Sequence, residues 1–284
     1  SEHPFDGSWG YQNTGFFAPT SRYGTAAQLM ELIDKLHNAG IGAIMDFVPV
    51  HFAVDAYGLK EFDGTALYEY PHKDVGESEW GSYNFIHSRR EVACFLQSAA
   101  NYWLKEYHFD GLRMDAVSRL IYWQGDEKRG ENGVTINFLK VMNQGLHRLH
   151  PTAMLIAEDS TAYPGVTRDA DKGGLGFDYR FAMGIPDFWA KFIKTPDSME
   201  KLWYEMTNHR VYDRTISYVE CHDQCINGDD AMIWRLIGDA MYTRMSPFNA
   251  TWNETRGVAL YRLMRAVTLN SAHAGWLNFM GAEV

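Results

Sequence analysis

The sequence lacks the features that mark membrane and nucleic-acid-binding proteins. No run of consecutive apolar residues approaches about 20, the length that spans a bilayer. Lys and Arg number 26 against 36 Asp and Glu and form no extended run, so the net charge of −10 argues against nucleic acid and anionic membranes as partners. The sequence also contains no short repeat, low-complexity tract or linker, which favours a single domain over residues 1–284.

Cysteine is scarce and odd in number. Only Cys94, Cys221 and Cys225 occur, and the last two lack the partners of a zinc site. We interpret all three as reduced thiols of a cytoplasmic protein and expect no metal. Residues 1–10 are polar and turn-rich, which predicts no signal peptide, although so abrupt a start also fits a cut end.

Apolar and aromatic residues, in contrast, are plentiful. Hydrophobic residues make up 46% of the 284 residues, ample for a large core. Aromatic residues make up 14%, and they serve either to fill that core or to stack on the apolar faces of sugar rings. Two tryptophans, Trp80 and Trp123, are candidates for contact with a sugar, but packing explains them at least as well.

Helical and extended patterns alternate along the chain, which predicts an α/β fold with a parallel sheet or barrel. Helices are expected at 25–38, 88–107, 135–150, 186–209 (with breaks) and 254–271. Strands are expected at 41–48, 109–118, 153–158, 177–181, 215–221 and 276–280. The six strands are too few to close a (β/α)8 barrel.

Several local signals refine this pattern. Ser88 and Glu91 have the spacing of a capping box, which predicts that a helix begins at Ser88. Residues 52–87 are too long for a simple connection, and such loops are usually functional. In the last helix, the inward-facing positions are expected to be Val258, Leu263, Met264 and Val267.

Carboxylates recur where the predicted strands end. Arg113 and Asp115 lie two apart in the strand 109–118 and therefore share a face, either as a structural ion pair or as part of a site. Since parallel barrels carry their active sites at the carboxyl ends of strands, these residues are expected to gather there. The set is Asp46, Asp115, Glu158 and Asp223, accompanied by His51 and His222.

This inventory suits the cleavage of an acetal with retention of configuration. One carboxylate attacks the anomeric carbon, and a second protonates the leaving oxygen and later takes a proton back. The two carboxyl groups must lie about 5–5.5 Å apart. Further charged groups can orient ring hydroxyls as the oxocarbenium-like state forms.

The same residues resemble the four ordered motifs of the α-amylase superfamily, glycoside hydrolase family 13. The motifs are D-F-V-P-V-H (46–51), G-L-R-M-D-A-V-S (111–118), I-A-E-D (156–159) and V-E-C-H-D-Q (219–224). Within that superfamily the chain is similar to the glycogen (1,4-α-glucan) branching enzymes. The closer match lies in W-G-Y-Q (9–12), F-F-A-P-T-S-R-Y-G (16–24), I-Y-W-Q-G-D (121–126), A-E-D-S-T (157–161) and L-N-F-M-G (277–281).

The resemblance implies a role for each matching residue. Asp115 would be the nucleophile, Glu158 the general acid and base, and Asp223 the carboxylate that stabilises the transition state. The substrate-binding residues would be Tyr11, stacked under the sugar, Asp46, bracing the network, and His51 and His222, bonded to sugar hydroxyls. Arg113 would keep Asp115 ionised and oriented, since an adjacent cation lowers the pKa of a carboxylate.

The resemblance also implies a fold and an activity. The fold would be an incomplete (β/α)8 TIM barrel without the first strand, most of the second, the N-terminal carbohydrate-binding domain and the C-terminal β-domain. The activity would be transfer of an α-1,4-glucan chain to a 6-hydroxyl, by a monomer without cofactor. A hydrolase of the amylase type and an inactive glucan-binding fragment stay open as alternatives.

Overall fold

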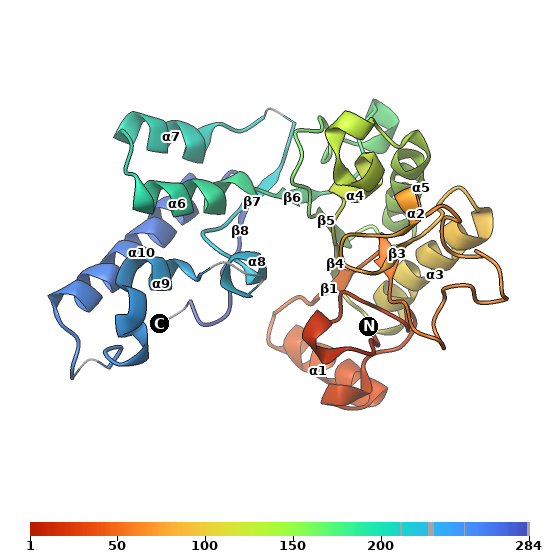
Figure 1. The fold of residues 1–284 in the computed structure, drawn as a ribbon, viewed down its shortest axis with the longest axis horizontal. Helices are drawn as coiled ribbons and strands as arrows, with labels where there is room; N and C mark the ends of the chain where they lie inside the picture. Colours follow the sequence, from red (N-terminus) through yellow and green to blue (C-terminus); the bar gives the residue numbers. More distant parts are fainter. Residues whose placement is uncertain (211, 227–229, 247, 283–284) are drawn as a thin grey trace. The chain divides into compact units, whose positions relative to one another are not determined.

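Helices and parallel strands alternate along the chain, as the sequence predicts (Figure 1). The structure is a computed structural model that describes residues 1–210, 212–226, 230–246 and 248–282. It comprises two units, unit 1 from Ser1 to Tyr179 and unit 2 from Arg180 to Val284. A single domain over residues 1–284 stays a prediction.

Three parallel strands form the centre of unit 1. They are β1 (Ile44–Phe47), β4 (Gly111–Met114) and β5 (Met154–Ala157), with β4 between the other two. In this register Asp46 pairs with Arg113, and Arg113 pairs with Ile156. Since paired residues point to the same side, the polar side chains of neighbouring strands are brought level.

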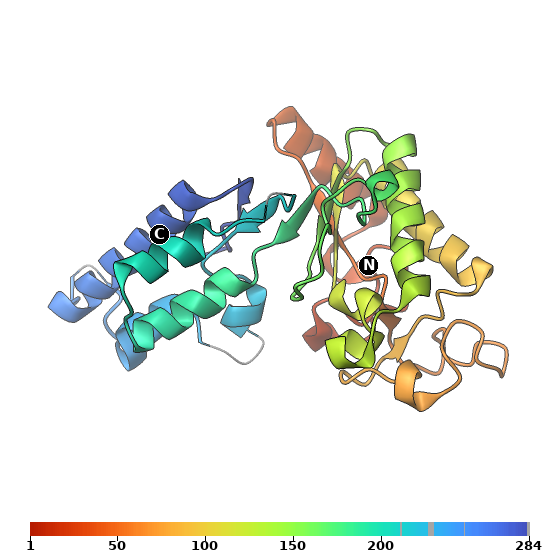
Figure 2. The same cartoon turned by 90° about the horizontal axis from the view of Figure 1, so that it is seen from above.

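Long amphipathic helices cover these strands. They are α1 (Ala26–Asn38), α3 (Arg90–Glu106) and α5 (Gly133–Leu149), and α3 and α5 lie side by side in Figure 2. Their apolar stripes bury the core together with the strands. The side chains of this core with no exposed surface include Leu96, Trp103, Leu112, Met114, Leu139 and Leu155.

The capping box expected at Ser88 and Glu91 is wrong. Helix α3 begins at Arg90 after Arg89, whose side chain does not cap the helix. The Nη1 atom of Arg89 instead donates to the carbonyl oxygens of Ala66 and Leu67, at 2.6 Å each. These tertiary bonds replace the local bonds that the sequence pattern predicts.

The strand expected at 109–118 is shorter, because β4 ends at Met114. Ala116 adopts a left-handed φ of 46°, which breaks the extended chain. The short helix α4 (Ser118–Ile121) follows at once.

The long segment 52–87 is more ordered than expected. Two antiparallel strands, β2 (His51–Phe52) and β3 (Tyr83–Asn84), close its ends, and α2 (Lys73–Gly76) lies within it. His51 pairs with Asn84 in this hairpin, so the segment returns to the histidine that precedes it.

Three shorter parallel strands follow, the first of which begins with the last residue of unit 1. They are β6 (Tyr179–Phe181), β7 (Thr215–Ser217) and β8 (Gly275–Trp276), with β7 in the middle. The helices of this part are α6 (Gly184–Lys194), α7 (Met199–Thr207), α8 (His222–Ile226), α9 (Met232–Ile237) and α10 (Trp252–Ser271). Short 3-10 turns complete the chain at Asp6–Ser8, Ser21–Tyr23, Trp123–Gly125, Glu127–Arg129, Ala170–Lys172 and Gly238–Tyr242.

Helix α10 packs through a narrower face than the sequence predicts. Its buried positions include Gly257, Tyr261, Met264 and Thr268, whereas Leu263 is 57% exposed, so the inward position expected for Leu263 is wrong. A Cβ atom on Gly257 would lie 2.4 Å from Cγ1 of Ile237 in α9. This close approach of two helices sets the inward face of α10.

No helix among the described residues is both long and apolar enough to cross a membrane.

Candidate active site

Arg113 is the centre of the site in unit 1. Its Nη1 atom lies 2.6 Å from Oδ1 of Asp46 and 2.9 Å from Oδ1 of Asp115. Its Nη2 atom lies 2.7 Å from Oε1 of Glu158. The structure thus brings together three predicted carboxylates around one guanidinium that is 6% exposed.

Strand register explains why these groups meet. Asp46 and Arg113 are paired across β1 and β4. Beyond the strand ends, the backbone N–H of Asp115 donates to Phe47 O, and that of Glu158 donates to Met114 O, both at 3.0 Å. The ladder therefore continues one residue past the strands, and it delivers both carboxyl groups to the same edge as Arg113.

The backbone at Ala116, which is left-handed, also binds Glu158 through hydrogen bonds. Its backbone N–H donates to Oε2 of Glu158 at 2.8 Å, and the N–H of Val117 donates to the Glu158 carbonyl at 2.8 Å. A non-glycine residue at φ 46° is strained by about 1–3 kcal/mol, and such strain clusters at functional sites. Both carboxyl oxygens of Glu158 are thus fixed before any ligand binds.

Tyr11 joins the cluster from the N-terminal loop. Its hydroxyl donates to Oδ2 of Asp46 at 2.8 Å and accepts from Nη1 of Arg113 at 3.3 Å. Burial, followed by the charge of Asp46, raises the pKa of Tyr11 far above its ordinary value. The phenol therefore stays neutral, and Asp46 braces Tyr11 and Arg113 together.

Burial and charge set the protonation of this cluster. Burial raises the pKa of Asp115, and the charge of Glu158 and a hydrogen bond between the two carboxyl groups raise it further, while Arg113 opposes the rise. Although burial works against its charge, Asp46, Glu158 and Asp115 together raise the pKa of Arg113. The expectation that Arg113 keeps Asp115 ionised is therefore wrong for the protein without ligand, because burial and the neighbouring carboxylates outweigh the guanidinium.

His51 lies on β2 and is almost fully buried. Its ring packs against Trp80, with the ring centroids 5.1 Å apart. Burial, and then the charge of Arg119, lower the pKa of His51 to about 4. The imidazole is therefore neutral at pH 7.

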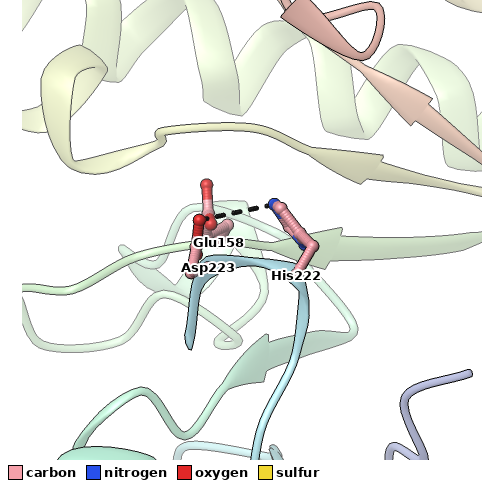
Figure 3. Close-up of side chains that lie close together, drawn as sticks. All are labelled: Glu158, His222 and Asp223. Atoms are coloured by element: carbon pink, nitrogen blue, oxygen red, sulfur yellow. Dashed lines mark ion pairs between the residues drawn. The ribbon is translucent and has the colours of Figure 1, made fainter. Parts of the chain in front are cut away.

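The remaining predicted residues lie in unit 2. His222 and Asp223 do not stand at the end of a strand, since β7 ends at Ser217 and both begin helix α8. Nε2 of His222 lies 3.4 Å from Oδ1 of Asp223, the pair marked by the dashed line in Figure 3, which also draws Glu158, the residue after β5. The functional grouping of these residues with the carboxylates of unit 1 stays a prediction.

Among the described residues of unit 1 taken by itself, no three histidine, cysteine or carboxylate side chains offer ligand atoms within 4.8 Å of one another. The guanidinium of Arg113 already supplies the positive charge between Asp46, Asp115 and Glu158.

Sequence reasoning missed the residues that support His51. Arg119 lies over the Trp80 ring, with its guanidinium carbon 4.2 Å from the centroid, and it bonds Gln124 at 2.9 Å. The I-Y-W-Q-G-D motif (121–126), one of the motifs that carry the family resemblance, contains Gln124. Its spacing, however, does not show that this loop contacts the segment 52–87.

The sequence comparisons identify homologues. No protein-family model matches the chain. It is 44% identical over 253 residues to the 1,4-alpha-glucan branching enzyme GlgB of Cutibacterium acnes, 42% over 240 to that of Fusobacterium nucleatum and 38% over 298 to that of Dechloromonas aromatica. These alignments cover 84%, 84% and 100% of this chain but 39%, 39% and 45% of those proteins. The chain thus spans about two fifths of the length of the curated relatives it matches, and its predicted resemblance to them is confirmed.

Solved structures of similar fold include an alpha-amylase and a pullulan hydrolase. The chain matches an alpha-amylase from Geobacillus thermoleovorans solved with acarbose, with TM-score 0.66 and 18% identity over 100% of this chain and 59% of that one. It matches the type III pullulan hydrolase from Thermococcus kodakarensis with TM-score 0.68 and 19% identity, over 96% and 46%. These matches confirm the predicted fold class, an α/β chain built as part of a (β/α)8 barrel.

Proposed function

We propose that this homologue of the 1,4-alpha-glucan branching enzymes carries the catalytic residues of a retaining transglycosylase, which cleaves an α-1,4 link and transfers the chain to a 6-hydroxyl. The observation that carries the proposal is the contact of Arg113 with Asp46, Asp115 and Glu158. Asp115 and Glu158 contact the same guanidinium, which places the proposed nucleophile and the proposed acid side by side.

In the first half-reaction, Asp115 attacks the anomeric carbon of the donor glucan. The bond from that carbon to the leaving oxygen breaks while Glu158 gives its proton to the oxygen. The product is a glycosyl ester on Asp115 and a shortened glucan. Arg113 holds Oδ1 of Asp115 at 2.9 Å, which leaves the other carboxyl oxygen to form the ester.

In the second half-reaction, Glu158 takes the proton of an acceptor 6-hydroxyl. The hydroxyl oxygen attacks the anomeric carbon from the face that the leaving group vacated, and the ester bond to Asp115 breaks. Asp115 is again a carboxylate, Glu158 is again an acid, and the new link is α-1,6. The carboxyl groups supply all of this chemistry, so the proposal includes no cofactor and no metal.

The other predicted residues bind the sugar in this proposal. Tyr11 stacks under the ring, His51 and His222 bond its hydroxyls, and Asp223 stabilises the charge that develops on it. The neutral state of His51 suits this role, because a neutral imidazole both donates and accepts hydrogen bonds.

We further propose that the partner is an α-1,4-glucan of the glycogen or amylose type, bound by a monomer in the cytoplasm. The cytoplasmic location rests on the cysteines, because Cys94, Cys221 and Cys225 form no disulfide among the described residues.

A hydrolase is the second candidate, because an amylase and a pullulan hydrolase share the fold. The same carboxylates serve both reactions, and the difference is whether water or a sugar hydroxyl reaches the ester. Incubation with amylose separates them. A fall in iodine colour without new reducing ends supports transfer, whereas reducing ends released in proportion to cleavage identify a hydrolase.

An inactive glucan-binding fragment is the remaining alternative. Soluble, folded protein that retards in an amylose-containing gel but turns over neither amylose nor a maltooligosaccharide would establish it. A folded sample that neither binds nor turns over glucan would reject the proposed substrate class.

A further inference from the structure

Gln124 uses its whole side-chain amide to join two separate segments of unit 1. Its Oε1 atom accepts from Nη1 of Arg119 at 2.9 Å and from Nδ2 of Asn84 at 3.1 Å. Its Nε2 atom donates to the carbonyl oxygens of Asp74 and Glu77, at 3.0 and 2.8 Å. An amide can make about four hydrogen bonds, so this side chain is fully engaged.

The backbone of Gln124 is unusual as well. Its φ of 57° and ψ of 22° lie in the left-handed region, although it is not a glycine. This conformation interrupts the turn Trp123–Gly125. A strained backbone of this kind persists only where the surrounding contacts impose it, and the four bonds of the side chain supply those contacts.

Both bonds of Gln124 Oε1 lead to His51. Arg119, held by Gln124 and by an ion pair with Glu79 at 2.5 Å, covers the Trp80 ring. That ring packs in turn against the imidazole of His51. Along the other branch, Asn84 is the β3 partner of His51 in the hairpin. One amide therefore fixes both the ring contact and the backbone neighbour of the same histidine.

We propose that Gln124 is a positioning residue that holds His51 in place through Arg119, Trp80 and Asn84. The inference rests on the proposed function in one respect, namely that His51 contacts the sugar. Gln124 itself touches neither Asp115 nor Glu158 in the contacts described above, so it acts on substrate binding through His51 alone.

The test compares Gln124→Met with Arg129→Ala. Methionine keeps the length of the side chain but removes all four hydrogen bonds. Arg129 pairs with Asp74 at 2.6 Å and so joins the same two segments, and the side-chain hydrogen bonds and ion pairs described for it are all with Asp74. Equal thermal melting temperatures of the two variants would show that both fold.

The first readout is independent of activity. In protein labelled with ¹³C at histidine, the His51 signal is the one missing in His51→Ala, and the nearby Trp80 ring shifts it from the ordinary position. We expect Gln124→Met to move this signal toward its position in Trp80→Ala, and Arg129→Ala to leave it unchanged. A His51 signal that stays at the wild-type position in Gln124→Met would overturn the inference.

The second readout is amylose affinity by gel retardation. Gln124→Met should weaken binding by about threefold to tenfold, the effect of losing one or two well-placed hydrogen bonds. The double variant with His51→Ala should bind as His51→Ala does, because Gln124 acts through that residue. Additive losses would overturn the inference. If the His51 signal moves as expected but wild-type protein binds no glucan, the positioning role stands and the proposed function fails.

Discussion

Nη1 of Arg113 lies 2.9 Å from Oδ1 of Asp115, two residues further along the same strand direction. The spacing alone is compatible with an ordinary structural ion pair. The same guanidinium, however, also contacts Asp46 at 2.6 Å and Glu158 at 2.7 Å. Asp46 lies on β1, and Glu158 is the residue after β5. Three carboxylates on one buried cation leave an excess of negative charge, which adds to burial in raising the pKa of Asp115.

The first prediction concerns the nucleophile. Asp115→Asn keeps an oxygen that can accept from Arg113 but cannot form the ester. Glucan transfer should fall on the order of 10⁴-fold or more, while amylose retardation in gels persists. Transfer assays with labelled maltooligosaccharide measure the loss. Residual transfer within tenfold of wild type would remove Asp115 from the role of nucleophile.

The second prediction concerns stability and the same carboxyl group. Because its folded pKa is raised, Asp115 favours folding below its ordinary pKa of 3.8, and this contribution is lost as pH rises through the raised value. The side-chain amide that replaces it in Asp115→Asn does not titrate. The melting temperature of Asp115→Asn, relative to wild type, should therefore increase between pH 4 and pH 8. A difference that stays constant over this range would contradict the raised pKa.

The third prediction concerns Arg113. Arg113→Met retains much of the volume but leaves Asp46, Asp115 and Glu158 without their common cation. Breaking a buried ion pair from one side costs about 3–5 kcal/mol, so unfolding should become easier by that amount at pH 7. The loss should shrink at pH 5, because Asp115, whose pKa is raised in the folded protein, takes up a proton more readily there. Urea unfolding at both pH values measures it, and an equal loss at pH 5 would argue against carboxylate repulsion.

The fourth prediction concerns a buried histidine outside the proposed chemistry. His87 bonds the Pro49 carbonyl through Nε2 at 2.9 Å, and burial lowers its pKa from 6.5 to about 4. Its neutral form therefore favours folding above pH 6.5, and the contribution is lost as pH falls toward 4, by up to about 3 kcal/mol. His87→Gln can donate to the same carbonyl without titrating. Its melting temperature should fall less than that of wild type between pH 7 and pH 4.5.

The fifth prediction concerns the approach of α9 and α10. Gly257→Ala places a Cβ 2.4 Å from Cγ1 of Ile237, so it should destabilise the protein by about 1–3 kcal/mol. Ile237→Ala removes the clashing atoms. The double variant should consequently be more stable than the sum of the two single losses, as thermal unfolding of all four proteins would show. Strict additivity would mean that the two residues do not compete for space.

Periodicity predicts the centres of the elements well and their ends poorly. The alternation of Leu112 and Met114 with Arg113 marks β4, because apolar and charged side chains cannot share its buried outer face. The end of that strand depends on the left-handed Ala116, which no composition rule indicates. Likewise, the tertiary bonds of Arg89 decide where α3 begins.

The sequence likewise predicts some residues of the candidate site but not the contacts between them. Motifs and strand ends are sufficient to select Asp46, Asp115 and Glu158. The contact of Arg113 with Glu158 requires the strand order β1-β4-β5, a non-local fact that sequence spacing does not contain. The support of His51 by Gln124 joins residues far apart in the sequence, and it depends on loop geometry alone.

In the proposed reaction, the negative charge passes between two carboxyl groups that both contact Arg113. In the proposed first half-reaction, Asp115 loses its negative charge as it becomes an ester, and Glu158 gains one as it gives up its proton. Arg113 touches both groups, at 2.9 and 2.7 Å, so the charge passes from one of its contacts to another. In this proposal, the guanidinium therefore needs little movement during the first half-reaction, because it already contacts both carboxyl groups.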